Sequence, residues 1–169
     1  MENVKELPHK AYSLVFCRRI EGGEKQILLG LKKRGFGEGK LNGYGGKKEL
    51  GESMKECGAR ELQEECGLVA TDLEHCASLE FKMPDLLMLV EVFQCWHFEG
   101  TAIETDEMKP QWTLESELPA IFRAMQTWAD DELWLPQVLA GAQLCGRFEY
   151  ASDNETVVSY SLFPIESLK

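Results

Sequence analysis

Residues 46–68, GKKELGESMKECGARELQEECGL, predict a helix whose two ends can both be located in the sequence. Ser53 can accept a hydrogen bond at the helix N-terminus, and Glu56, three residues later, completes a capping box. Gly67 suits the left-handed conformation in which many helices end. Small or apolar residues recur every four positions and predict the buried side of this helix: Met54, Gly58, Leu62 and Cys66.

Three glutamates on this helix, Glu61, Glu64 and Glu65, raise the question of what balances their charge. Like charges three or four positions apart repel one another on a helix. One interpretation is a solvated acidic surface on which Arg60 pairs with Glu56 or Glu64. The other is a cation site, since clustered carboxylate oxygens suit Mg²⁺ or Mn²⁺. From the residues alone, the solvated surface is favoured.

The length of 169 residues favours one domain over residues 1–169, long enough to bury a core. The longest apolar run, at residues 86–90, is far shorter than the roughly 20 residues of a membrane span. The polar N-terminus also lacks the apolar segment of a signal peptide. We therefore expect an intracellular protein without membrane contact, in the cytoplasm with room for a nuclear or mitochondrial fraction.

The six cysteines form no CxxC pair, and several lie within apolar runs. This pattern favours buried, reduced thiols over a disulfide framework or a zinc site.

The net charge of −11 argues against stable nucleic-acid binding, because such proteins normally carry a basic surface. One local window is different, since residues 32–48 contain six basic side chains and a single acid, Glu38. The window predicts either a bound anion or a basic loop that only aids solubility, and charge alone does not separate the two.

The remaining pattern predicts a mixed α+β fold with a central sheet flanked by helices. Residues 11–18 and 26–33 read as a hairpin, and seven glycines between residues 35 and 51 indicate a loop or a very short strand. Residues 77–83 and 86–98 read as strands, and residues 106–118 as a connector. Residues 118–144 hold one or two helices with a break near Pro136, and residues 146–152 and 156–163 form a second hairpin.

The spacing within residues 46–68 then changes the interpretation of the acidic helix. Five residues separate Gly46 from Glu52, and seven separate Glu52 from the run RELQEECGL at residues 60–68. This resembles the Nudix box, GX5EX7REUXEEXGU with U aliphatic, at every specified position. The resemblance implies the Nudix fold, an α/β/α sandwich, and hydrolysis of a pyrophosphate linkage with Mg²⁺ or Mn²⁺.

The same resemblance implies roles for individual residues. Glu65 helps deprotonate the attacking water, and Arg60 orients the glutamates. From the residues themselves we expect the nearby lysines Lys32 and Lys47 to meet phosphate oxygens, beside the glycine loop whose backbone can approach them closely. The implied metal ligands are the Gly45 carbonyl, Glu61, Glu64, Glu65 and Glu107.

Further segments, such as LKKRGFGEGKLNGYGGK and TWADDELWLP, resemble the branch of this family that hydrolyses oxidised purine nucleoside triphosphates. The implied reaction converts 8-oxo-dGTP, 2-hydroxy-dATP or O6-methyl-dGTP to the monophosphate and pyrophosphate, which sanitises the nucleotide pool. The implied enzyme is a monomer. The alternatives are another Nudix activity, on ADP-ribose or a dinucleoside polyphosphate, or a non-catalytic nucleotide-binding module.

The resemblance also implies a substrate pocket. Its residues are Ser13, Lys32, Phe36, Asn42, Tyr44, Gly45, Gly46, Lys47, Phe81, Met88, Trp128, Asp130, Asp131 and Tyr150. The chain differs from the usual residues of the branch at Ser13, Leu41, Tyr44, Ala129 and Tyr150, so the ranking of damaged purines stays open.

Asp130 and Asp131 have a physical rationale as base readers. Two adjacent carboxyls in a partly dry pocket cannot both ionise easily, so one holds a proton and donates while the other accepts. Oxidation at C8 of guanine turns N7 into an N–H donor, which an ionised carboxylate detects. The residues alone favour plainer interpretations: Asp130 as a helix cap, Asn42 as a left-handed turn residue, and the aromatics as core. The resemblance reverses that preference.

Overall fold

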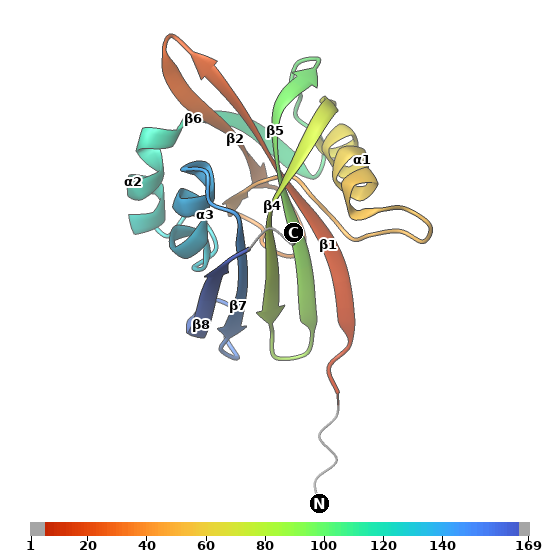
Figure 1. Ribbon diagram of the computed structural model, residues 1–169, viewed down its shortest axis with the longest axis vertical. Coiled ribbons are helices and arrows are strands. Elements are labelled where there is room, and N and C mark those ends of the chain that lie inside the picture. Colours follow the sequence, from red (N-terminus) through yellow and green to blue (C-terminus); the bar gives the residue numbers. More distant parts are fainter. Residues whose placement is uncertain (1–5, 166–169) are drawn as a thin grey trace, which may run out of the picture.

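The computed structural model describes residues 6–165. Its centre is an eight-stranded sheet with the order β3-β2-β1-β5-β4-β7-β8, and β6 pairs with β2 (Figure 1). The strands are β1 (His9–Glu21), β2 (Glu24–Lys32), β3 (Leu41–Asn42), β4 (Val69–Lys82), β5 (Leu87–Glu99), β6 (Met108–Leu114), β7 (Leu144–Tyr150) and β8 (Val157–Pro164). The sheet is mixed, because β1 runs parallel to β5 and β4 parallel to β7.

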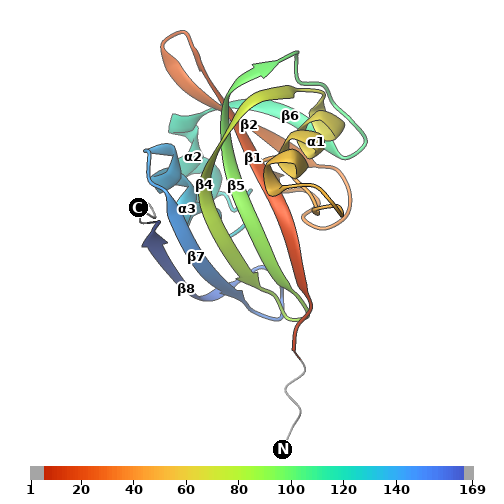
Figure 2. The same cartoon turned by 45° about the vertical axis from the view of Figure 1, so that its right-hand side comes forward.

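Helices cover both sides of this sheet, which confirms the predicted α+β class. They are α1 (Met54–Cys66), α2 (Leu118–Arg123) and α3 (Asp131–Leu139), with a short 3₁₀ turn, η1 (Glu115–Glu117). Helix α1 lies on one side, and α2 and α3 lie on the other (Figures 1 and 2). Alternation along β1 sends Val15 into a core with Leu62 of α1, and Phe16 into a second core with Trp134 of α3.

Helix α1 forms as its local sequence predicts. Ser53 accepts from the backbone N–H of Glu56 and donates its own backbone N–H to the Glu56 carboxylate, completing the capping box. The helix ends at Gly67, whose φ of 80° lies in the left-handed region. Gly58, Leu62 and Cys66 are buried as predicted, and Met54 is half-buried. These signals depend on contacts within four residues, so they can be read without the tertiary fold.

The region after β5 differs from its prediction in two ways. The connector predicted for residues 106–118 contains β6, which pairs with β2 along its whole length. Pro110 and the polar residues beside it conceal this strand in the sequence. The helical break also lies elsewhere, at residues 124–130, where Met125 has a φ of 56°. Pro136 lies inside α3, so the predicted break at that residue is wrong.

Strand β4 begins at Val69, directly after α1, rather than at the predicted Ala77. Its early part has three register shifts against β5, which disrupt the alternation that would have identified it.

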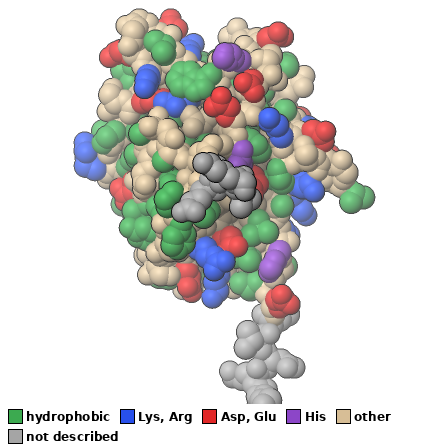
Figure 3. Space-filling view, in the orientation of Figure 1, with side chains coloured by type: hydrophobic (Ala, Val, Ile, Leu, Met, Phe, Trp, Pro, Cys, Tyr) green, Lys and Arg blue, Asp and Glu red, His purple; other side chains and the backbone are tan. Residues whose placement is uncertain are grey.

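The six cysteines are free thiols, and all except Cys145 are buried, as the sequence predicts. Within residues 6–165, no helix is long and apolar enough to span a membrane. On the face shown in Figure 3, basic side chains lie scattered among acidic and hydrophobic ones, so this face has no continuous basic surface.

Candidate active site

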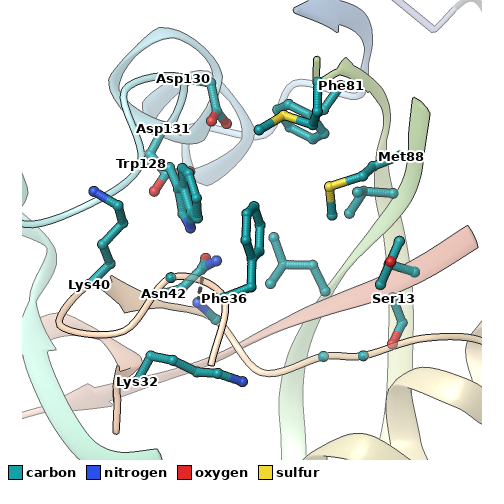
Figure 4. Close-up of a pocket in the computed structure, with 18 of the residues that line it drawn as sticks. Ser13, Lys32, Phe36, Lys40, Asn42, Phe81, Met88, Trp128, Asp130 and Asp131 are labelled. Atoms are coloured by element: carbon teal, nitrogen blue, oxygen red, sulfur yellow. Dashed lines mark hydrogen bonds between the residues drawn. The ribbon is translucent and has the colours of Figure 1, made fainter. Parts of the chain in front are cut away.

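A cavity of about 270 Å³ opens between the glycine loop, β1, β5 and the start of α3 (Figure 4). It brings together residues that are up to 138 positions apart, from Tyr12 to Tyr150. The predicted pocket residues that line it are Ser13, Lys32, Phe36, Asn42, Gly45, Gly46, Phe81, Met88, Trp128, Asp130, Asp131 and Tyr150. Glu65, predicted as catalytic, lines the same cavity.

Two predicted pocket residues are absent from its lining. The ring of Tyr44 is fully buried in the core beneath α1, and its hydroxyl has no hydrogen-bond partner among the described residues. Alternation explains this, because the backbone of Gly43 and Gly45 faces the cavity while the side chain between them points the other way. Lys47 also lies outside the lining. Ser13 does line the cavity, although its hydroxyl lies 3.3 Å from the thiol of Cys57 on α1.

The prediction did not include several lining residues. These include the apolar residues Met83, Val90 and Met108, the aromatic Trp134 and the basic Lys40. Two of these had a signal in the sequence. Val90 lies two positions from Met88 and therefore on the same side of β5, and Lys40 belongs to the basic window of residues 32–48.

An aromatic pair forms one wall of the cavity. Phe36 stacks on Trp128 with ring centroids 4.9 Å apart, and its ring projects into the space between Trp128 and Met88 (Figure 4). Phe36 is 60% exposed, so the pair lies at the opening and offers a flat apolar surface to a planar ring.

Asn42 lies in β3, where it pairs with Gly30 of β2. Its side-chain oxygen accepts the backbone N–H of Gly43 at 2.8 Å, which fixes the orientation of the amide. Asn42 is not among the described non-glycine residues with positive φ, which are Met125 and Asn154. The alternative interpretation as a left-handed turn residue is therefore wrong.

Asp130 and Asp131 are both buried, each only 4% exposed. Asp130 occupies the N-cap position of α3, as the local pattern predicts, but its side chain makes no capping hydrogen bond. Its carboxylate instead accepts from the Tyr150 hydroxyl and, at 2.7 Å, from the indole N–H of Trp134. Burial raises the pKa of the Asp130 carboxyl, while these two donors act in the opposite direction. Burial, followed by the charge of Asp130, raises the pKa of Asp131 well above its usual value.

Glu65 of α1 also lines the cavity and is 8% exposed. Burial raises the pKa of its carboxyl to about 8, and Glu61 and Glu107 add to the rise, while Lys32 and the Gly45 backbone oppose it. Burial also raises the pKa of Glu61 against the effect of Arg60. The acidic surface is therefore only partly solvated, and its charges are incompletely balanced by the protein.

Arg60 joins the glutamates to the loop before α1. Its guanidinium donates to Glu52 at 2.8 Å, Glu61 at 2.9 Å and Glu64 at 3.2 Å, and also to the carbonyl of Lys47. The predicted pairing with Glu64 is present. Glu56 instead serves the capping box. Such a network holds two neighbouring carboxylates in one orientation, the positioning role implied for Arg60.

The donor set fits a hard divalent cation, although no three acidic, histidine or cysteine side chains of residues 6–165 already converge on one point. Glu64 faces Arg60, and Glu107 pairs with Arg34 at 2.6 Å and Lys32 at 3.5 Å. The cluster nevertheless consists of carboxylate oxygens, and mutual repulsion contributes to the raised pKa of Glu65. A divalent cation would relieve that repulsion with the ligand type it prefers.

Comparison with known proteins places this geometry in context. The NUDIX domain model matches residues 9–136. A mouse protein named oxidized purine nucleoside triphosphate hydrolase is 40% identical over 160 residues, covering 94% of this chain and 97% of that protein. The zebrafish protein of the same name is 39% identical over 145 residues, covering 85% and 90%.

Solved structures agree on the fold. The MutT protein of Bacillus halodurans superposes with a TM-score of 0.75 at 23% identity, covering 90% of this chain and 97% of that one. The NUDIX domain of Shewanella oneidensis NrtR, solved with ADP-ribose, has a TM-score of 0.61 at 14% identity, covering 80% and 88%.

Proposed function

The chain belongs to the NUDIX family, and we propose that it hydrolyses oxidised purine nucleoside triphosphates to the monophosphate and pyrophosphate. One observation carries the proposal: a single cavity is lined both by a buried aspartate pair at the start of α3 and by the buried Glu65 of the Nudix box on α1, two helices on opposite sides of the sheet (Figure 1). A nucleotide bound along it would place its base against the aspartates and its phosphates beside the glutamates. The names of the mouse and zebrafish relatives support this substrate class.

The phosphate end suits hydrolysis of the bond between the α- and β-phosphates. Gly45, Glu61, Glu64 and Glu65 would hold Mg²⁺, which when bound neutralises phosphate oxygens and lowers the pKa of water. Without metal the pKa of Glu65 is about 8. A bound divalent cation would favour the ionised carboxylate, which can then take a proton from the attacking water. Arg60 keeps the neighbouring carboxylates in place.

Lys32 lines the cavity near this end, where its ammonium can meet a phosphate oxygen. Glu107 pairs with Lys32 and Arg34 and would join the metal ligands only by leaving these partners. Lys47 stays a candidate phosphate contact only through movement of its loop, since it lies outside the cavity lining.

The base end suits an oxidised purine. A carboxyl pair sharing one proton presents a donor and an acceptor side by side, and the Asn42 amide is held in one orientation nearby. The apolar and aromatic walls accept the flat ring. A site that hydrogen-bonds an altered atom discriminates more strongly than one that reads shape alone.

A substrate panel tests this function directly. With Mg²⁺, we expect 8-oxo-dGTP, 2-hydroxy-dATP or another damaged purine triphosphate to be hydrolysed with higher kcat/KM than dGTP, ADP-ribose and dinucleoside polyphosphates. Measuring released pyrophosphate identifies the cleaved bond. Preference for ADP-ribose or a dinucleoside polyphosphate would contradict the proposal, and binding without turnover would favour a non-catalytic module.

Two variants test the base end. Asp130→Asn and Asn42→Ala should each lower kcat/KM for the preferred substrate about ten- to a hundredfold, the value of a hydrogen bond to a charged group. The melting temperature of Asn42→Ala should stay within a few degrees of the wild type, whereas Asp130→Asn should lower it by several degrees, because its amide turns a donor toward Tyr150 or Trp134. Unchanged kinetics in both variants would remove this end of the cavity from the substrate site.

We further propose that the enzyme is a monomer in the cytoplasm, with a nuclear or mitochondrial fraction. Light scattering and cell fractionation measure these two properties.

A further inference from the structure

Tyr150, the last residue of β7, makes an unusual contact with the aspartate pair. It is 5% exposed, and its hydroxyl donates to Oδ1 of Asp130. The hydroxyl oxygen also accepts the backbone N–H of Asp130 at 3.3 Å. The indole N–H of Trp134 donates to Oδ2 of the same carboxylate at 2.7 Å. Both oxygens of Asp130 therefore receive a donor from the protein.

This arrangement suits an ionised Asp130. An indole N–H can only donate, so it requires an acceptor at Oδ2. The Tyr150 oxygen already accepts from a backbone N–H, so its proton is free to point at Oδ1. If Asp130 carried a proton, one of these donors would face another donor, which is costly in a buried site.

Asp131 is equally buried, but no side chain among the described residues donates a hydrogen bond to its carboxyl. A backbone contact with Trp128 favours the ionised form of Asp131, but Asp130 has two side-chain donors and Asp131 has none. Because two adjacent buried carboxyls cannot both ionise easily, the one without side-chain donors keeps the proton. The other charged groups around the pair are Lys40, whose ammonium lies 2.8 Å from Glu155 of the β7–β8 turn, and Lys32 and Glu65 further along the cavity. Lys40 is thus already paired with a carboxylate of its own.

We propose that Tyr150 determines which carboxyl of the pair holds the proton, leaving Asp130 as the acceptor and Asp131 as the donor toward the base. This inference rests on the proposed function. A fixed acceptor beside a fixed donor matches a 6-oxopurine, whose edge presents a carbonyl oxygen next to a ring N–H. A 6-aminopurine presents the reverse order. Tyr150 therefore acts as a specificity-determining residue that favours guanine-type over adenine-type damaged bases.

Tyr150→Phe removes one oxygen and leaves the ring. Binding of 8-oxo-dGMP without metal is measured by calorimetry between pH 4.5 and 9, in the wild type and in the variant. Without the phenol donor, ionised Asp130 is less stable, so its proton binds at higher pH. The acidic limb of binding should move upward by about one pH unit. Titration of the ligand is the same for both proteins and cancels in the comparison.

Kinetics give a second readout. The kcat/KM ratio of 8-oxo-dGTP to 2-hydroxy-dATP should fall about tenfold in the Tyr150→Phe variant, because the proton can then move between the two carboxyls. A purely structural role for Tyr150 would lower both values together and leave the pH profile unmoved.

Two controls isolate the effect. Tyr160→Phe removes a phenol that stacks on Phe148 but is 54% exposed and outside the cavity, and should change neither readout. In an Asp130→Asn background, where this carboxyl cannot ionise, adding Tyr150→Phe should produce no pH shift. A shift of the same size in that background would overturn the inference.

The outcomes separate the two proposals. Superimposable pH profiles of the wild type and Tyr150→Phe, with 8-oxo-dGMP bound by both, would overturn the role of Tyr150 and leave the proposed function standing. Absence of 8-oxo-dGMP binding by either protein at any pH would overturn the proposed function and this inference with it.

Discussion

Glu65→Gln is expected to abolish turnover while making the metal-free protein more stable at alkaline pH. The carboxylate is the base in the proposed mechanism and one of the metal ligands, so kcat should fall about a hundred- to ten-thousandfold. Glutamine keeps the size of the side chain, so the loss reflects its chemistry. Pyrophosphate release with 8-oxo-dGTP and Mg²⁺ measures it.

The effect on stability follows from the pKa of Glu65, which rises from 4.5 to about 8 on folding because of burial and then Glu61. The folded protein therefore holds this proton more tightly than the unfolded chain. The resulting contribution to stability is fully present below pH 4.5 and is lost as the pH rises through about 8. Above that pH the wild type has an ionised carboxylate in a buried position, which glutamine avoids.

In EDTA at pH 8.5, the free energy of unfolding of Glu65→Gln should exceed that of the wild type by roughly 2 to 4 kcal/mol. The size of the shift in the pKa of Glu65 sets the upper end of this range. At pH 4.5 the two proteins should be nearly equal. Urea denaturation at both pH values measures the difference. Glu64→Gln is the matched control, because Glu64 is exposed, and it should show no such pH dependence. A stability difference that is the same at both pH values would contradict the assignment of the buried charge to Glu65.

Alanine at Gly45 and at Gly46 is expected to give two different defects, although the residues are adjacent. A Cβ on Gly45 would lie 1.8 Å from the Ser13 carbonyl oxygen and 2.6 Å from its carbon, both backbone atoms. The chain must move away from β1, which breaks the hydrogen bonds between Ser13 and Gly46 and between Val15 and Tyr44. Ser13 and Gly46 share one of these bonds, and Val15 and Tyr44 share two. The loss of all three should cost about 2 to 4 kcal/mol of stability.

A Cβ on Gly46 would instead lie 2.3 Å from the carboxyl carbon of Glu61, the end of a flexible side chain. Glu61 can turn aside, but it then leaves its hydrogen bond with Arg60 and its place beside Glu65. The stability of Gly46→Ala should change little, while the Mg²⁺ concentration for half-maximal activity rises about ten- to a hundredfold.

Thermal denaturation in EDTA and Mg²⁺ titration of activity separate the two variants. Gly51→Ala is a control for the loop, since its Cβ would meet no atom within 4 Å; its φ of 84° predicts a loss of stability of about 1 to 2 kcal/mol from backbone strain alone. Equal Mg²⁺ dependence of Gly46→Ala and the wild type would place Glu61 outside the metal site.

The partner of Asp130 could not be predicted from the sequence pattern. The run ADDEL at residues 129–133 has the local pattern of a helix start, and by itself it predicts a cap. The observed partner of Asp130 is Tyr150, twenty residues further on and in a different element. No periodicity or spacing relates two such residues. Only the resemblance to the oxidised purine branch indicated that they belong together.

The predictions for Tyr44 and for the segment that forms β6 are wrong for a related reason. Tyr44 is an aromatic residue in the glycine loop, which suggests a pocket position. The side on which its side chain lies depends on how this loop pairs with β1, through the bridge between Val15 and Tyr44. Strand β6 has no clear alternation and exists because β2 offers it an edge. Both outcomes are decided by pairing between segments distant in the chain.

The sequence by itself determined α1, its capping box, its C-terminal glycine and the order of the glutamates, because these depend on contacts within a few residues. It also indicated the mixed fold and the reaction class through the spacing of the Nudix box. Only the tertiary structure decided that Glu65 is buried, that Tyr44 faces away from the cavity and that Tyr150 meets Asp130. Burial and long-range hydrogen bonds arise when sheet and helices pack together, and the pKa values that control this site follow from that packing.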